Sequence, residues 1–310
     1  MVVLGDALLD ILVAPVQPVV AGGDVPATIR MGPGGQGANV AVRLARRGAD
    51  VTLECGLADD PAGAFIRAAL EAEGIGLAAV DVERSGTVVV LLAPDADRSM
   101  LSHRPDLAGA LAASPHAGDD AAWWVVSGYV LLEAGGADLA ARVAGRETRR
   151  AILGCSLRPH QASAWAAAAT AAEPTLMVLN RDEATTIVGG PPSPIAVAER
   201  FGCLAVVTGR DGAEAAVPGG APSVTVPSVP AEAVDATGAG DAFAAALIHR
   251  LSAAAWPPDA PDLTAALVDA AALAAAVTGV YGAQGRVAGE GGSDRIRAAD
   301  SGAASGTLPA

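Results

Sequence analysis

The chain has 310 residues, of which 52% are hydrophobic and 17% are charged, and its formal net charge is −14. This length and composition predict one large globular domain with a substantial core. The negative charge argues against nucleic acid as a partner, because phosphate backbones require clustered positive charge.

Lysine is missing from the sequence, so all 20 basic residues are arginine. A P-loop needs the lysine of GxxxxGK[ST], and a protein kinase needs a strand lysine on the nucleotide phosphates. Both classes are therefore excluded in their usual form. Any phosphoryl chemistry in this chain must rely on backbone amides, a metal ion and arginine.

The first apolar run, residues 2–20, is interrupted by Asp6, Asp10 and two prolines. Such interruptions are not compatible with a signal peptide or a membrane-spanning helix. We therefore expect a cytoplasmic protein with no membrane partner.

Apolar, β-branched runs then alternate with alanine-rich segments of helical length. This βαβ pattern predicts a mostly parallel sheet with helices on both faces. The expected strands are residues 2–12, 51–55, 123–126, 176–179 and 204–207.

Three other segments interrupt this alternation. Residues 13–31 are irregular, whereas residues 86–101 predict a β-hairpin with its turn at 94–97, and the two can pair as a small accessory sheet. Residues 289–310 are rich in Gly, Ala and Ser, which predicts a disordered tail.

A first glycine-rich motif, GPGGQGANVAV, spans residues 32–42. Its glycines satisfy GxGxxG, and Glu54 follows where a dinucleotide-binding acid can lie. About twenty irregular residues separate the first strand from these glycines, however, whereas that motif requires a tight strand-to-helix turn. The alternative is a pocket wall in which Asn39 caps the next helix and offers both a donor and an acceptor to a polyol.

A second motif, VDATGAGDAFAAAL, spans residues 234–247 and predicts a small-residue turn followed by a helix. Gly238, Ala239 and Gly240 leave the first amides of the helix open to an anion, which the helix dipole also attracts. Asp241 lies beside them, where a carboxylate can accept the proton of an attacking hydroxyl. Taken alone, Asp241 could equally be a first-turn acid favoured by the dipole.

Residues 34–63, GGQGANVAVRLARRGADVTLECGLADDPAG, and residues 235–243, DATGAGDAF, together resemble the two signature regions of the ribokinase-like (PfkB) carbohydrate kinases. The resemblance covers nearly the whole chain, from residue 5 to about residue 284. It implies a single ribokinase-like three-layer α/β domain over residues 1–288. It also implies that the accessory segments, at about 13–31 and 86–101, form a small β lid.

In function, the resemblance implies ATP-dependent transfer of the γ-phosphoryl group to an alcohol of a sugar, expected to be a primary hydroxyl. Asp241 matches the general base, and Gly238, Ala239 and Gly240 match the anion hole. The residues expected to bind the substrate are Asp10, Gly34, Gly35, Gln36, Asn39 and Arg158.

The sequence departs from the family pattern at Gln36 and in the stretch before Arg158. Gln36 stands where ribokinases commonly carry lysine, which argues against ribose as the substrate. Arg158 fits a DxNxR stretch of related sugar kinases, but Gly154 and Ser156 replace its Asp and Asn. The resemblance therefore leaves the identity of the sugar open.

For the nucleotide, Asn180 and Glu183 match the family element NxxE, which holds Mg²⁺. From the residues alone they could equally be a helix N-cap and a first-turn acid. Thr208, Gly209 and Gly212 resemble the ATP-binding turn TxGxxGA, although the motif here is one residue short.

Asp235 and Thr237 match a monovalent-cation site, and the GAQ at residues 282–284 resembles the end of that site, which implies activation by K⁺. The lid of this family often pairs between subunits, so a homodimer through the lid is expected. Two alternatives remain open: a nucleoside kinase on the same fold, and a metabolite-binding homologue without turnover.

Overall fold

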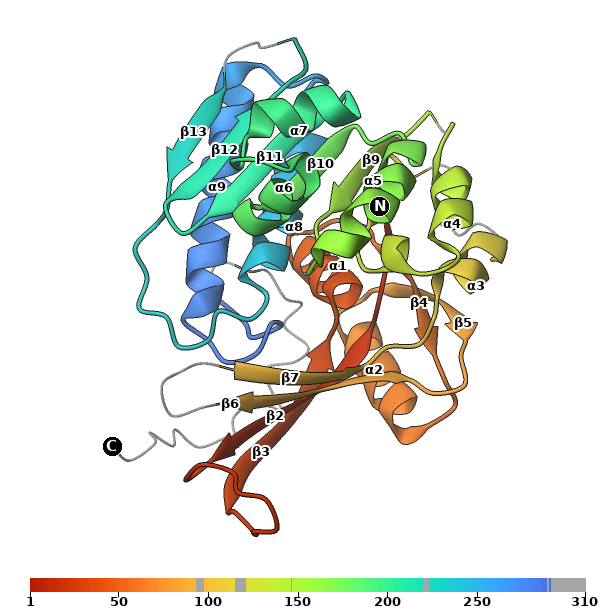
Figure 1. Cartoon of the computed structure of the whole chain (residues 1–310), viewed down its shortest axis with the longest axis vertical. Coiled ribbons are helices and arrows are strands. Elements are labelled where there is room, and N and C mark those ends of the chain that lie inside the picture. Colours follow the sequence, from red (N-terminus) through yellow and green to blue (C-terminus); the bar gives the residue numbers. More distant parts are fainter. Residues whose placement is uncertain (93–97, 115–120, 146, 220–222, 289, 291–310) are drawn as a thin grey trace.

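The computed structural model describes residues 1–92, 98–114, 121–145, 147–219, 223–288 and 290. A nine-stranded sheet lies between two layers of helices, and a four-stranded sheet extends from one end of the molecule (Figure 1). The expected three-layer α/β fold with a small β sheet is therefore confirmed. The expected turn at 94–97 and the expected tail, apart from Glu290, lie outside the described residues.

Neighbouring strands of the large sheet pair in parallel, except that the second-to-last strand in the sequence pairs antiparallel with the strands on both sides of it. In spatial order its strands are β13 (Val224–Pro227), β12 (Gly212–Ala216), β11 (Leu204–Gly209), β10 (Leu176–Asn180), β9 (Arg149–Leu153), β8 (Trp123–Val126), β1 (Val2–Leu4), β4 (Thr52–Leu57) and β5 (Gly76–Asp81).

Buried side chains divide between the two faces of this sheet. In β1, Val3 packs into one core while Val2 and Leu4 pack into the other, as the alternation of a strand requires. The first core receives α1 (Gln36–Arg46), α2 (Pro61–Ala72), α8 (Ala239–Ser252) and α9 (Ala260–Thr278). The second receives α3 (Ala108–Ala113), α4 (Gly136–Val143), α5 (Ala162–Ala171), α6 (Arg181–Val188) and α7 (Pro194–Phe201), with the 3₁₀ turns η1 (Val130–Leu132) and η2 (Pro159–Gln161) nearby.

The four-stranded sheet, called the lid here, consists of β3 (Ala27–Gly34), β2 (Leu8–Pro15), β6 (Gly86–Leu92) and β7 (Arg98–His103), in that spatial order. The expected hairpin between β6 and β7 is confirmed. The expected bounds of the lid were too narrow. Residues 8–12 belong to it, and the stretch expected to be irregular, 13–31, contains the end of β2 and the first part of β3 on either side of the irregular residues 16–26.

The prediction of one strand over residues 2–12 is wrong, because the chain leaves the large sheet after Leu4 and enters the lid at Leu8. Gly5 permits this crossing. A Cβ at Gly5 would lie 2.8 Å from the Cβ of Ser127 and 2.9 Å from the Cα of Gly37. The turn at Gly5 therefore brings β1, β8 and α1 into close contact.

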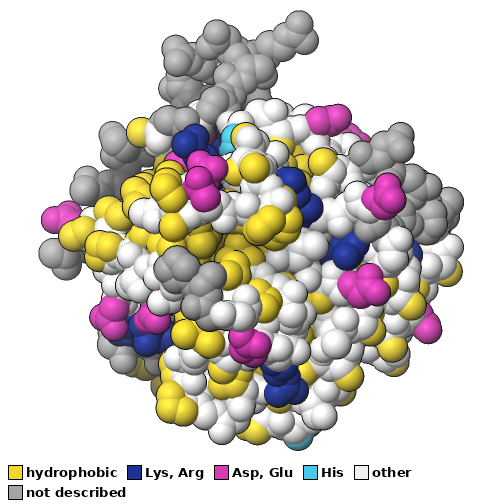
Figure 2. Space-filling view, turned by 90° about the horizontal axis from the view of Figure 1, so that it is seen from above, with side chains coloured by type: hydrophobic (Ala, Val, Ile, Leu, Met, Phe, Trp, Pro, Cys, Tyr) yellow, Lys and Arg dark blue, Asp and Glu magenta, His cyan; other side chains and the backbone are white. Residues whose placement is uncertain are grey.

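Helix α9 is long and apolar enough to cross a membrane by length and composition. In this fold it packs against α8, and Leu263, Leu267 and Val277 are buried in the core. The apolar composition of α9 is therefore also that expected of a helix that covers one face of a sheet. On the face of the molecule shown in Figure 2, arginines lie singly or in small groups among acidic and apolar side chains.

The parallel strands end at one edge of the large sheet, and polar or small residues follow several of them. Asp6 follows β1, Ser127 follows β8, Gly154 follows β9 and Asn180 ends β10. In open α/β sheets, ligands bind outside these carboxyl ends. The fold therefore predicts the functional site at this edge.

Glu54 does not have the position of a dinucleotide-binding acid. It is buried in β4 and forms two hydrogen bonds with Arg142 of α4, of 2.6 and 2.9 Å. Arg142 also donates to the carbonyl of Leu111 and lies over the ring of Trp124. The pair joins α4 to the sheet, and the dinucleotide interpretation loses its acidic residue.

We predict that Arg142→Met lowers the free energy of unfolding by about 3–5 kcal/mol, because it leaves a buried carboxylate without its partner. Replacing both members, with Glu54→Met and Arg142→Met together, should restore most of the loss. Urea unfolding followed by tryptophan fluorescence measures both effects. Equal loss in the single and double variants would contradict this account of the pair.

Candidate active site

A cavity of about 300 Å³ lies at the carboxyl edge of the sheet and is called the phosphate cavity here. It brings together residues from both motifs and from the strands between them. Seven of the expected site residues line this cavity, namely Gln36, Asn180, Glu183, Thr208, Gly238, Gly240 and Asp241.

Asp241 occupies the first turn of α8, which begins after Gly238 without a side-chain cap. The first amides of a helix have no acceptor within the helix. Ala239 donates to the carbonyl of Ala236 at 3.3 Å, so the amides of Gly238 and Gly240 on either side of it are the ones offered to an anion in the cavity. Gly238 has a φ of 78°, a conformation that favours glycine, and the Cβ position at Gly240 faces open space. The second motif therefore forms an open helix N-terminus beside a carboxylate.

The Asp241 carboxylate is partly buried, and Oδ2 accepts a 2.8 Å hydrogen bond from Asn39 Nδ2. Burial raises the pKa of Asp241 to about 7, and the hydrogen bond from Asn39 opposes that rise. Asp6 and Asp10 raise the pKa further, whereas Arg43 lowers it. A carboxyl group with a pKa near neutrality is suited to exchange protons with a substrate.

The expectation that Asn39 caps a helix is wrong. Helix α1 begins after Gly35, which has a φ of 94° and provides no side-chain cap, while Asn39 lies within the helix and is only 5% exposed. Its amide binds Asp241 on one side, and on the other it accepts a 3.0 Å hydrogen bond from Gln284. Position 34, just before α1, requires glycine because a Cβ there would overlap the carboxylate of Asp10.

Gln36 lines the phosphate cavity, but the protein itself engages both ends of its amide. Its oxygen accepts from the Ser127 hydroxyl at 2.6 Å and from the Gly128 amide at 3.1 Å, and its nitrogen donates to the Gly154 carbonyl at 2.8 Å. Gln36 thus connects α1 to the ends of β8 and β9. A substrate would compete with these contacts.

Asn180 and Glu183 form a capping box at the start of α6. Asn180 Oδ1 accepts from the Glu183 amide at 2.9 Å, and Glu183 Oε2 accepts from the Asn180 amide at 2.8 Å. Burial raises the pKa of Glu183 to about 7, and Asp182 and Asp241 add to the rise. Asn180 and Glu183 therefore form the helix cap that the sequence allowed as the alternative to a metal site. Glu183 also borders the phosphate cavity.

Gly154 makes room for Glu183. A Cβ at Gly154 would lie 1.9 Å from Glu183 Oε2, so a larger residue there would displace the carboxylate. The replacement of the family's Asp by Gly154 is thus linked to the position of Glu183. Arg158 is exposed and lies outside the lining of both cavities described here.

The segment TGRDGA forms a tight hairpin between β11 and β12, in which Gly209 pairs with Gly212. Thr208 lines the phosphate cavity, whereas the two glycines do not. A Cβ at Gly209 would meet the Arg181 side chain at 2.4 Å, and Gly212 has a φ of 135°. Both glycines are thus required by the hairpin itself.

Asp235 connects the turn before α8 to the segment after α9. Its carboxylate accepts 2.9 Å hydrogen bonds from the amides of Thr237 and Gly282. The expected components of the cation site, residues 235, 237 and 282–284, are therefore adjacent.

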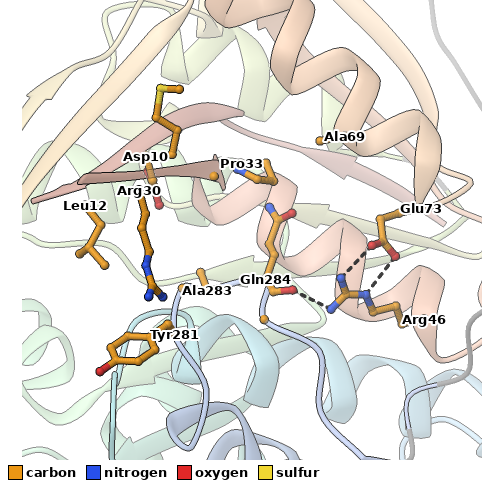
Figure 3. A pocket seen from close by; sticks show the side chains of 14 residues that line it. Asp10, Leu12, Arg30, Pro33, Arg46, Ala69, Glu73, Tyr281, Ala283 and Gln284 are labelled. Carbon is orange, nitrogen blue, oxygen red and sulfur yellow. Dashed lines mark hydrogen bonds and ion pairs between the residues drawn. The ribbon is translucent and has the colours of Figure 1, made fainter. Parts of the chain in front are cut away.

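A second cavity, of about 390 Å³, lies between the lid and the segment after α9 and is called the acceptor cavity here (Figure 3). Asp10 borders it from β2, and burial raises the pKa of Asp10 to about 6. Arg30 extends from the neighbouring strand β3, and its guanidinium lies 5.2 Å from the ring centre of Tyr281, which belongs to the segment after α9. Gln284 borders the acceptor cavity and binds Asn39, whose other partner is Asp241 in the phosphate cavity.

Sequence reasoning missed an ion pair between Arg104, just after β7, and Asp6, just after β1. The Arg104 guanidinium also lies 4.2 Å from the ring centre of Tyr129, which lines the phosphate cavity. This pair joins the lid to the carboxyl edge of the sheet. The motif LGDALLD contains Asp6 as well as Asp10, and this second acid was the feature of the sequence that could have pointed to Asp6.

The fold matches those of solved kinases over most of their length. An adenosine kinase from Sinorhizobium meliloti aligns with a TM-score of 0.75 at 19% identity, covering 92% of this chain and 95% of that one. A ribokinase from Cryptococcus neoformans in complex with ADP gives 0.70 at 20% identity, covering 91% and 94%. A sugar kinase from Pyrococcus horikoshii in complex with ATP gives 0.71 at 21% identity, covering 91% and 93%.

These similarities show that the chain has the ribokinase fold. The model of the pfkB family carbohydrate kinases matches residues 1–288, so the chain belongs to that family. No curated protein matches the chain.

We predict that Asp241→Asn stabilises the ligand-free protein more at pH 8 than at pH 5. Because the folded-state pKa is raised from 3.8 to about 7, the charged carboxylate destabilises the fold by up to about 4 kcal/mol above pH 7, and less as the pH falls. Thermal unfolding at both pH values tests this. Asp182→Asn, at an exposed neighbouring acid, is the control, and an equal gain at both pH values would contradict the prediction.

Proposed function

We propose that this protein is an ATP-dependent kinase that phosphorylates an alcohol of a sugar, with Asp241 as its general base. The observation that supports this most directly is the position of Asp241 in the first turn of α8, beside amides open to an anion and across the same cavity from Glu183. Membership of the pfkB family supports the kinase class. The kinases solved with ADP and ATP support ATP as the donor.

In the proposed reaction, Asp241 accepts the proton of the acceptor hydroxyl while the hydroxyl oxygen bonds to the γ-phosphorus. The bond from that phosphorus to the β–γ bridging oxygen breaks, and ADP leaves. The amides at the start of α8, from Gly238 to Gly240, stabilise the charge on the transferring group. Among the described residues, Asp241 receives one recorded hydrogen bond, on Oδ2, so Oδ1 is the oxygen proposed to take the proton.

Glu183 and Asn180 would hold Mg²⁺. They supply oxygen atoms at the edge of the phosphate cavity, and a magnesium site commonly combines one or two carboxylates with phosphate oxygens and waters. The described residues contain no cluster of three or more His, Cys, Asp or Glu, which fits an ion shared with the nucleotide. The ion would neutralise phosphate charge.

Asp235 and Thr237 would hold a monovalent cation, for which K⁺ is the proposed ion. The Asp235 carboxylate already orders two backbone segments through the amides of Thr237 and Gly282. A cation bound there would stabilise the turn that leads into the anion-binding amides.

The acceptor alcohol would lie beside Asp10, Gly34 and Asn39, with the rest of the substrate in the acceptor cavity. Closure of the lid would exclude water and so favour transfer to the alcohol over hydrolysis. A nucleoside is the second candidate, because Tyr281 is 44% exposed at this cavity and can stack on a planar base. We place the enzyme in the cytoplasm.

Release of ADP from ATP with Mg²⁺ and K⁺ tests this function against ribose, fructose, ketodeoxygluconate, adenosine, inosine and pseudouridine. A substrate-dependent signal is expected, and Asp241→Asn should lower kcat by about 10²-fold or more because a general base is removed. Asp138→Asn, at an exposed first-turn acid of α4, is the matched control and should retain activity. If one compound raises the melting temperature but none releases ADP, the protein is a binding homologue and not a kinase.

We further propose that the lid pairs with the lid of a second copy. Its outer face carries exposed apolar side chains, including Ile29 and Met31 on β3 and Leu101 on β7. In the strand register, Met31 lies opposite Ile11, which lies opposite Val89, which lies opposite Leu101. The two outer members of this row are exposed and the two central ones, Ile11 and Val89, are partly exposed. A continuous apolar row that reaches the surface is typical of an interface.

We predict that Met31→Asp and Leu101→Asp each shift the protein toward the monomer, because a charge is unfavourable in the centre of an apolar interface. Light scattering coupled to size-exclusion chromatography measures the mass. Ile195→Asp provides the control, since Ile195 is an exposed apolar residue on α7. A monomeric unmodified protein at micromolar concentration would refute the proposed dimer.

A further inference from the structure

Three side chains form a hydrogen-bonded chain that ends on the proposed base. Gln284 Nε2 donates to Asn39 Oδ1 at 3.0 Å, and Asn39 Nδ2 donates to Asp241 Oδ2 at 2.8 Å. Asn39 is buried in α1 and uses both ends of its amide in these contacts. The Asp241 carboxylate is thus connected to a residue 43 positions later in the sequence.

The segment that carries Gln284 is fixed by two arginines of α1. Arg43 donates to the carbonyls of Ala283 and Gly285 at 2.7 and 2.9 Å. Arg46 donates to the carbonyl of Gln284 at 2.9 Å (Figure 3). Three consecutive carbonyls are therefore bound by side chains of the helix that also carries Asn39.

This arrangement decides which way the Asn39 amide faces. A primary amide has an acceptor on one side and a donor on the other. Because Gln284 presents its NH₂ group, the Asn39 oxygen faces Gln284 and the Asn39 NH₂ group faces Asp241. The ionised Asp241 carboxylate, which can only accept, favours the same orientation. Gln284 holds that orientation when Asp241 is protonated, because a protonated carboxyl could otherwise donate to the Asn39 oxygen.

We propose that Gln284 is a positioning residue for the phosphoryl transfer proposed above, acting through Asn39 to keep a hydrogen-bond donor on the Asp241 carboxylate. The inference rests on the proposed function for its role in catalysis. The contact itself can be tested without any substrate.

Other charged groups around Asp241 set the direction of the expected effect. Asp6 and Asp10 raise its pKa, Arg43 lowers it, and Asp241 in turn raises the pKa of Glu183 across the phosphate cavity. Asn39 is the side-chain donor that lowers the pKa of Asp241. Losing this donor should therefore raise the pKa of Asp241, so that the base is ready only at higher pH.

The test measures the titration midpoint of Asp241 by ¹³C NMR of aspartate-labelled protein without ligands, with Asp241→Asn used to assign the resonance. Gln284→Met removes the donor at similar length and should raise the midpoint by about one pH unit. Gln284→Glu presents only acceptors to Asn39 and should raise it further. A midpoint that stays unchanged in Gln284→Met would overturn the proposal.

The Asn39→Leu background provides the matched control. If Gln284 acts through Asn39, Gln284→Met should shift the midpoint in the native background and leave it unchanged beside Asn39→Leu. An equal shift in both backgrounds would show a general change in the segment and would reject the positioning role.

The same variants give a catalytic readout once an acceptor is known. The acid limb of the kcat/KM profile should move to higher pH by the same amount in Gln284→Met, with activity recovered at high pH. An unmoved acid limb would overturn the proposal. If the NMR shift occurs but no alcohol is phosphorylated, the contact stands and the proposed kinase function fails.

Discussion

The contact between two buried arginines of α1 and the segment after α9 is the interaction on which the candidate site depends. Burying a guanidinium costs several kcal/mol unless it is paired and hydrogen-bonded. Arg43 meets this requirement with Glu290 at 2.6 Å, and Arg46 with Glu73 at 2.8 Å, in addition to their backbone acceptors. The planar fork of arginine can bind a carboxylate and carbonyls at once, whereas the single ammonium of lysine cannot match that geometry.

Fixing this segment also fixes the helix N-terminus opposite it. Gly282 donates to Asp235, and a Cβ at Gly238 would lie 2.6 Å from the Cβ of Ala283, so the turn before α8 packs directly on the segment. Helix α1 thus determines where the segment lies, and the segment determines where α8 begins. The two glycine motifs, about 200 residues apart, act as one structural unit for this reason.

The layers of the fold follow from the sequence because they depend on local pattern. Apolar runs of strand length and the capped start of α2, where Asp60 accepts from the Gly63 amide at 2.7 Å, carry their own signals. The crossing at Gly5 does not, since apolar residues of strand type lie on both sides of the Gly5–Asp6 pair and the close neighbours of Gly5 come from elsewhere in the chain. Contacts such as Gln284 with Asn39, 245 residues apart, leave no trace in a single sequence, and the role of Asn39 was misassigned for that reason.

The same limit applies to the charge of the site, which is a property of burial and not of composition. Asp241, Glu183 and Asp10 all have raised pKa values, with burial as the largest cause in each. Near neutral pH these acids are therefore partly protonated, and an approaching polyphosphate meets less negative charge than the sequence implies. The guanidinium of Arg104, which lies near the phosphate cavity, is already paired with Asp6. In the proposed kinase, the amides of α8 and a metal ion would then supply attraction for phosphate, which is how a chain without lysine can bind a nucleotide.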